Sequence, residues 1–182
     1  MHRMTSIQAR RMRRPVLQAD IDAGARCARP GFDPDFFFRA DGEPPATWQA
    51  QRAAAVRFCH GCPVRAACEE LALRDGDGNP RVDDLVRGGR SGHELVALRG
   101  VQAERLAAAI SADVASDTEW KALTGIAVEL GDEARRTPTR SGGMPHQSVL
   151  QRQQNERIAE LAAKLAVVRS ARRARTGWEV VA

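Results

Sequence analysis

The sequence has few of the side chains that build a large apolar core. Among its 182 residues there are no tyrosines, three tryptophans and five phenylalanines, so aromatic residues make up only 4%. Alanine, with 31 residues, supplies much of the 43% apolar fraction. Alanine favours helices but buries little area, so we expect a small core. A small core often needs a metal site or disulfides to be stable.

Lysine is also scarce, because 26 of the 28 basic residues are arginine. The net charge is +5 and the isoelectric point is about 9.7. A basic chain favours polyanionic partners such as nucleic acid, and arginine suits contacts to phosphate and guanine. The same Ala- and Arg-rich, Lys-poor composition also arises from a GC-rich genome. Charge alone therefore does not establish a DNA partner.

Long apolar runs are missing as well. No run approaches the roughly 18 residues that a membrane span needs, and the first 18 residues lack the apolar segment of a secretory signal. We therefore expect a cytoplasmic protein without a membrane partner, in which four cysteines are metal ligands or redox groups rather than disulfides. The four histidines are scattered, and we find no Ser/His/Asp set, phosphate-binding glycine loop or paired-carboxylate motif. We expect no enzymatic activity.

Changes in composition along the chain predict five segments. Residues 1–20 are basic with few large apolar side chains and predict a disordered arm, whereas residues 21–100 hold all four cysteines and form the predicted main domain. Helical periodicity predicts an extension over residues 101–134. A polar linker over 135–147 and a basic helix and tail over 148–182 follow. No convincing strand pattern is present, so we predict an all-α fold.

Helix signals are clearest around the cysteines and near the C-terminus. Thr47 predicts the start of a helix that ends near Cys59. Pro63 predicts the start of another, which ends near Arg74 before an Asp-Gly-Asp-Gly-Asn-Pro breaker. A stripe of a and d positions predicts a C-terminal helix that packs on its own chain or forms a short coiled coil. Its members are Ile158, Leu161, Leu165 and Val168.

Four cysteines form the candidate metal site. Cys59 and Cys62 make a C-x2-C pair, Cys68 follows after five intervening residues, and Cys27 lies upstream of the pair across an interval of 31 residues. A C-x2-C turn directs two thiolates at one centre, and Gly61 lets the backbone pass close to it. Four thiolates fit either Zn²⁺ or a [4Fe–4S] cluster. Zinc sites usually have two such pairs, so the single pair favours the cluster, with Zn²⁺ as the alternative.

Two further interpretations of the cysteines remain open. The four thiols could be unliganded and partly buried as small apolar groups. Alternatively, Cys59 and Cys62 could cycle as a thiol–disulfide oxidoreductase, although no thioredoxin-like βαβ pattern surrounds them. Besides these two interpretations, the chain could be an interaction module whose fold is stabilised by a zinc ion bound to the cysteines.

The cysteine segment resembles the WhiB family of actinobacterial transcription regulators. After Cys27, Asp33-Pro34-Asp35 is followed by three consecutive phenylalanines, similar to the family's D-P-x-x-F-F segment. The family's C-x2-C-P-V-x3-C core is matched in full from Cys59 to Cys68. Gly88 and Gly89 correspond to the glycines of its G-[VI]-W-G-G turn. The resemblance covers roughly residues 26–98.

The resemblance implies a cofactor, a fold and partners. It implies a [4Fe–4S] cluster bound by Cys27, Cys59, Cys62 and Cys68, with a helical domain wrapped around it. It also implies a regulator that responds to oxygen or nitric oxide and binds DNA, the primary sigma factor of RNA polymerase, or both.

One position departs from the family pattern, since Arg87 stands where the family has tryptophan. Arginine cannot replace that apolar area without burying charge. We expect Arg87 to face solvent or to pair with Asp83 or Asp84. Sigma-factor binding is therefore the family property that this sequence supports least.

A basic cluster near the C-terminus is the candidate DNA contact. It ends the predicted C-terminal helix, where cations also favour the helix dipole, and no helix-turn-helix is recognisable. The cluster consists of Arg169, Arg172, Arg173 and Arg175.

Overall fold

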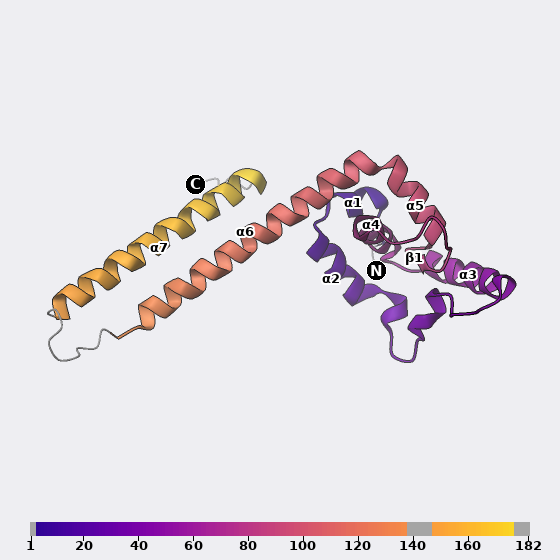
Figure 1. The fold of residues 1–182 in the computed structure, drawn as a ribbon, viewed down its shortest axis with the longest axis horizontal. Helices are drawn as coiled ribbons and strands as arrows, with labels where there is room; N and C mark the ends of the chain where they lie inside the picture. Colours follow the sequence, from indigo (N-terminus) through magenta and orange to yellow (C-terminus); the bar gives the residue numbers. More distant parts are fainter. Residues whose placement is uncertain (1–2, 138–146, 177–182) are drawn as a thin grey trace. The chain divides into compact units, whose positions relative to one another are not determined.

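The computed structural model describes residues 3–137 and 147–176, except for the side chains of Gln147, Arg175 and Thr176. The protein is all-α, as predicted, with one small hairpin (Figure 1). The elements are α1 (Ser6–Arg11), α2 (Arg14–Gly24), the 3-10 helices η1 (Arg26–Ala28) and η2 (Pro34–Phe37), α3 (Pro45–His60), α4 (Arg65–Asp75), β1 (Val86–Arg87), β2 (Arg90–Ser91), α5 (Gly92–Val101), α6 (Ala103–Arg135) and α7 (Gln147–Thr176). The chain divides into two compact units after Asp113.

The N-terminal segment differs from the predicted disordered arm, because residues 6–24 fold into α1 and α2. A capping box starts α1: the side chain of Thr5 accepts from the backbone of Gln8, and that of Gln8 accepts from the backbone of Thr5. Ala9 and Leu17 are fully buried against two alanines of α4, which lies beside both helices (Figure 1). Alanines on the facing helix allow close approach, and Met4, Met12 and Ile21 pack around the same contact.

The second core cluster holds the aromatic segment against α3. Trp48 and Ala55 on α3 are buried with Phe37 of η2 and Val86 of β1. The ring of Phe32 lies 4.7 Å from that of Phe58, at the C-terminal end of α3. This helix begins at Pro45, two residues before the Thr47 cap predicted from the sequence, because proline suits the first turn of a helix.

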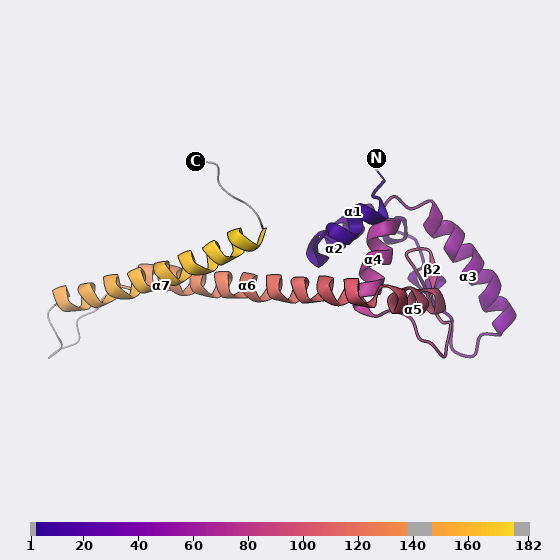
Figure 2. The same cartoon turned by 90° about the horizontal axis from the view of Figure 1, so that it is seen from above.

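The hairpin connects α4 to α5. Gly88 and Gly89 form the two-residue turn between β1 and β2, with φ values of 62° and 76°. A tight turn with positive φ at both positions is the type that fits strand twist, and it favours glycine. A capping box between Ser91 and Glu94 then starts α5, and Leu95 packs with Leu73 of α4. The turn expected from the sequence is therefore a short hairpin, seen from above in Figure 2.

A buried ion network ties α4 to the beginning of α6. Arg74 donates to Glu70 at 2.8 Å and to Asp113 at 2.9 Å, and both Arg74 and Glu70 are almost fully buried. Arg105 binds the same Glu70 carboxylate at 2.8 and 3.0 Å. Asp113 also accepts from the backbone nitrogen of Arg14, at the start of α2. Such networks specify one arrangement of helices rather than adding much net stability.

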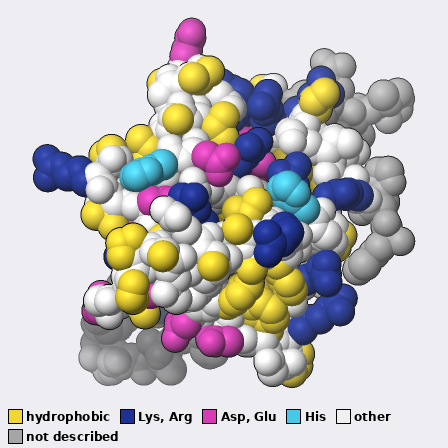
Figure 3. All heavy atoms as spheres, turned by 90° about the vertical axis from the view of Figure 1, so that its right-hand side faces the viewer, with side chains coloured by type: hydrophobic (Ala, Val, Ile, Leu, Met, Phe, Trp, Pro, Cys, Tyr) yellow, Lys and Arg dark blue, Asp and Glu magenta, His cyan; other side chains and the backbone are white. Residues whose placement is uncertain are grey.

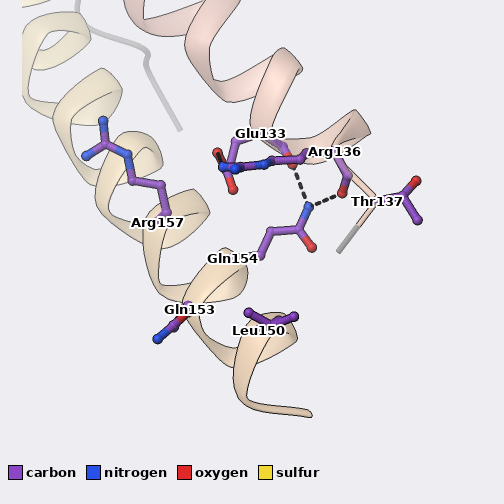
Figure 4. A pocket seen from close by; sticks show the side chains of 7 residues that line it. All are labelled: Glu133, Arg136, Thr137, Leu150, Gln153, Gln154 and Arg157. Atoms are coloured by element: carbon purple, nitrogen blue, oxygen red, sulfur yellow. Dashed lines mark hydrogen bonds and ion pairs between the residues drawn. The ribbon is translucent and has the colours of Figure 1, made fainter. Parts of the chain in front are cut away.

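The second unit pairs residues 114–135 of α6 with α7, and the two helices lie side by side in both views (Figures 1 and 2). Leu161 and Leu165 of the predicted stripe are buried. The side-chain amide of Gln154 donates at 2.6 Å to the carbonyl oxygens of Glu133 and Arg136 (Figure 4). It thereby adds a donor to carbonyl groups at the end of α6, where the helix leaves few backbone partners.

The exposed surface carries mixed charge. On the face drawn in Figure 3, arginines and carboxylates are interspersed around a group of apolar side chains. Among the helices in the described ranges, none has both the length and the apolarity that a membrane crossing requires.

Candidate metal centre

The four cysteines come from four places in the first unit. Cys27 lies in η1, Cys59 in the last turn of α3, Cys62 in the loop after it, and Cys68 in the first turns of α4. All four are free thiols. Cys27 is exposed, Cys59 and Cys68 are half-buried, and Cys62 is buried.

Three of the four thiols share one cavity. Cys27, Cys59 and Cys68 line a cavity of about 440 Å³, whose wall also includes Phe37 and Val86 of the aromatic core cluster. Cys62 does not line this cavity. Its thiol nevertheless lies close enough to interact electrostatically with Cys27 and Cys59. The structure thus gathers the cysteines predicted to act together, three of them around a common space.

Burial makes these thiols hard to ionise. Burial, together with the smaller effect of the neighbouring cysteine thiolates, raises the pKa of Cys59 to about 11. Burial also raises the pKa values of Cys27 and Cys68. Several negative sulfurs in one apolar space repel one another, and a bound cation relieves that repulsion. The arrangement therefore suits a metal-bound state better than free thiolates.

The glycine turn of the hairpin faces the cysteines. Backbone hydrogen bonds from Gly89 to Cys59 and from Gly88 to Cys68 favour the thiolates and lower their pKa values against the larger effect of burial. A β-carbon on Gly89 would lie 3.4 Å from the β-carbon of Cys59. N–H groups directed at ligand sulfurs are a means by which proteins tune metal–sulfur centres.

Arg87 does not have the partners expected from the sequence. Instead of facing solvent or pairing with Asp83 or Asp84, it forms ion pairs with Asp75 and Asp77, and its side chain lines the cysteine cavity. Asp83 is engaged by Arg52 of α3. The sequence did contain a signal for this pairing, because both carboxylates belong to the Asp-Gly-Asp-Gly breaker that follows the Cys68 helix.

The residues around the cavity fit an iron–sulfur cluster. Four thiolates on one zinc ion at about 2.3 Å are roughly 3.8 Å apart, whereas a four-iron cluster spreads its ligands more widely. The cavity volume, the apolar wall and the two backbone donors all suit such a polyatomic group. Within residues 3–137 and 147–176, no group of three or more His, Cys, Asp or Glu side chains is arranged to hold a single metal ion.

The C-terminal arginines lie in the second unit, along the end of α7. Arg169, Arg172 and Arg173 line a hollow of about 580 Å³ together with Trp120 of α6. The guanidinium carbon of Arg172 lies 5.5 Å from the centre of the Trp120 ring, within cation–π range. The side chain of Arg175 lies outside the described residues.

The fold and cavity together define a small helical domain with a cysteine-lined centre. Residues 22–81 match the family model of the transcription factor WhiB. No curated protein and no solved structure matches the chain. The matched segment contains all four cysteines, and it supports the resemblance to the WhiB family that the sequence showed. The match ends before the hairpin, α6 and α7.

Sequence reasoning missed several contacts around this centre. Arg26, next to Cys27, places its guanidinium 4.9 Å from the ring centre of Phe58, which adjoins Cys59. A β-carbon on Gly61 would collide with the same guanidinium. No motif marks Arg26 in the sequence, since its position depends on how η1 folds back over the end of α3.

Proposed function

We propose that this chain is a redox- or nitric-oxide-responsive transcription regulator whose four cysteines bind a [4Fe–4S] cluster. The main support for this proposal is the shared cavity, in which cysteines from η1, α3 and α4 meet within the segment that matches the WhiB family. When bound, the cluster supplies a redox-active group that reacts with oxygen or nitric oxide. The chain's own residues supply the ligands, the apolar wall and the two backbone donors.

Ligation would link η1 directly to α3 and α4 through the bound centre. Cys27 lies between α2 and the phenylalanine segment, and it is the most exposed of the four thiols. Its bond to the centre would hold η1 against α3 and α4, so binding energy becomes folding energy. Release of Cys27 would free η1 and the neighbouring end of α2. The freed thiols could then be oxidised to disulfides, which changes the surface offered to partners.

The thiol–disulfide oxidoreductase alternative is less well supported. An active redox cysteine has a lowered pKa, commonly at the N-terminus of a helix. Cys59 lies instead at the C-terminal end of α3, where the helix dipole disfavours a thiolate, and burial raises its pKa to about 11.

DNA is the partner we propose for the basic end of α7. Arg169, Arg172 and Arg173 follow one another on the last turns of the helix, and guanidinium groups bind phosphate well. Sigma-factor binding is a weaker proposal, because Arg87 occupies the position of the family tryptophan and is turned to the cysteine cavity. A partner that needs an aromatic side chain at this position would not find one.

Binding measurements on anaerobic protein test the proposal. Cluster-loaded protein, protein treated with nitric oxide, and apo-protein are each titrated onto labelled promoter DNA and onto the isolated primary sigma factor. We expect the affinity for DNA, or for sigma factor, to differ at least several-fold between the loaded and treated forms. Equal binding by all three forms, or binding to neither partner, would contradict a cluster-controlled regulator.

A further inference from the structure

Arg87 is the one cationic side chain, among those described, that lines the cysteine cavity. It shares the cavity wall with Cys27, Cys59 and Cys68 and is about one-third exposed. Its guanidinium lies beside Cys68, where both its charge and a hydrogen bond favour the thiolate. A cation with N–H donors is thus directed at one of the proposed ligand sulfurs.

The guanidinium is held in place from several directions. Asp77 and Asp75 accept its ion pairs, the latter at 3.4 Å. Asp75 is itself paired with Arg14 of α2 at 2.8 Å, and the carbonyl oxygen of Asp77 accepts a hydrogen bond from Arg99 of α5. The backbone of Arg87 belongs to β1. A side chain fixed this way presents its donors without reorganisation.

This inference rests on the proposed iron–sulfur cluster. We infer that Arg87 is a positioning residue that fixes the Cys68 sulfur and raises the reduction potential of the bound cluster. Reduction adds one electron, and therefore one negative charge, to the cluster, and a nearby cation stabilises the more negative form.

The neighbouring carboxylates reduce this effect but do not cancel it. Asp75 and Asp77 bring two negative charges, which Arg87 and Arg14 together balance, and Asp22 is a further carboxylate on the cavity wall. The hydrogen bond to the sulfur acts over a shorter range than the carboxylate charges do. The hydrogen bond from Arg87 therefore still raises the reduction potential of the cluster where the surrounding carboxylates offset the charge of Arg87.

The hairpin provides a matched control. Arg90 faces Arg87 across the two strands but pairs with Glu69 and Glu94 instead. The variants Arg87→Gln and Arg90→Gln remove the same charge from neighbouring positions on one hairpin. Both are purified anaerobically with the wild-type chain, assayed for iron and sulfide, and titrated with dithionite in a spectroelectrochemical cell.

We expect Arg87→Gln to lower the equilibrium constant for one-electron reduction of the cluster by about tenfold or more. This corresponds to a fall of about 59 mV in the reduction potential. Arg90→Gln should shift it much less. A loaded Arg87→Gln protein with the wild-type potential, or equal shifts in the two variants, overturns the inference and leaves the proposed function intact. A wild-type chain without iron and sulfide overturns both.

A second variant tests the inference if the Arg87→Gln protein does not bind the cluster. Arg87→Lys keeps the charge but loses the planar fork that can reach the sulfur and a carboxylate together. We expect it to hold the cluster with a potential below those of the wild type and of Arg90→Gln. A potential equal to both would contradict a role for the guanidinium at Cys68.

Discussion

A β-carbon on Gly88 would lie 2.5 Å from the Cα of Glu69, the residue that follows Cys68 on α4. The hairpin turn therefore packs backbone against backbone, directly beside a proposed ligand. The positive φ of Gly88 and this close approach both require glycine. The glycine pair singled out in the sequence thus has a physical reason, which is to bring two N–H donors to the cysteines.

Replacing Gly88 with alanine tests this relationship. We expect Gly88→Ala to destabilise the fold by roughly 2–5 kcal/mol, from backbone strain and from overpacking against α4, and to reduce cluster content. The control is Gly42→Ala, because Gly42 has a similar φ of 76° with nothing within 4 Å of its β-carbon position. Urea unfolding and iron analysis of both variants provide the comparison. Equal losses would show that packing against Glu69 is unimportant.

The N-terminal helices provide a second test. Leu17 is fully buried between α2 and α4, so Leu17→Ala should cost about 2–5 kcal/mol in unfolding free energy. Val16, its neighbour on the same helix, is 45% exposed and serves as the control. Val16→Ala should have a much smaller effect. If Leu17→Ala unfolds at the wild-type urea concentration, the segment does not dock on α4.

The buried ion network between α4 and α6 provides a third test. Arg74→Met removes one cation from between Glu70 and Asp113 and leaves their buried charges partly unpaired. We expect a loss of about 3–5 kcal/mol by urea unfolding. Arg157→Met, which removes exposed ion pairs with Glu129 and Glu160, should cost far less. A small loss at Arg74 would mean that Arg105 alone satisfies Glu70.

DNA contact by α7 is tested through salt dependence. Each of Arg169→Ala, Arg172→Ala and Arg173→Ala should weaken DNA binding and reduce the slope of log K against log salt by about one. Arg135→Ala, at an exposed position that pairs with Asp132 on α6, is the control for lost charge in the same unit. Three unchanged slopes would remove the end of α7 from the DNA-binding surface.

The sequence predicted some parts of this structure well, for identifiable reasons. The second cysteine helix begins after Pro63 and ends at Asp75, followed by Gly76 as its C-cap with a φ of 83°. These signals could be predicted because they are local. The WhiB pattern likewise depends on spacing alone. The all-α fold followed from the lack of a convincing strand pattern.

Other parts depended on tertiary contacts and escaped prediction. The helices α1 and α2 are ordered by Ala9 and Leu17 meeting alanines of α4, which composition does not reveal. Arg87 turns to the cavity because Asp75 and Asp77 lie there, and their position depends on where α4 ends. The ligand role of the four cysteines stays a prediction.

The most direct measurement is an anaerobic ultraviolet–visible spectrum of the untagged chain with iron, sulfide and zinc analysis. The account predicts a broad absorption band near ~400 nm and about four irons and four sulfides per chain, as a [4Fe–4S] centre requires. It also predicts that Cys62→Ser loses both. Stoichiometric zinc without iron or sulfide after anaerobic preparation would contradict it, leaving a zinc-stapled module without a gas-sensing centre.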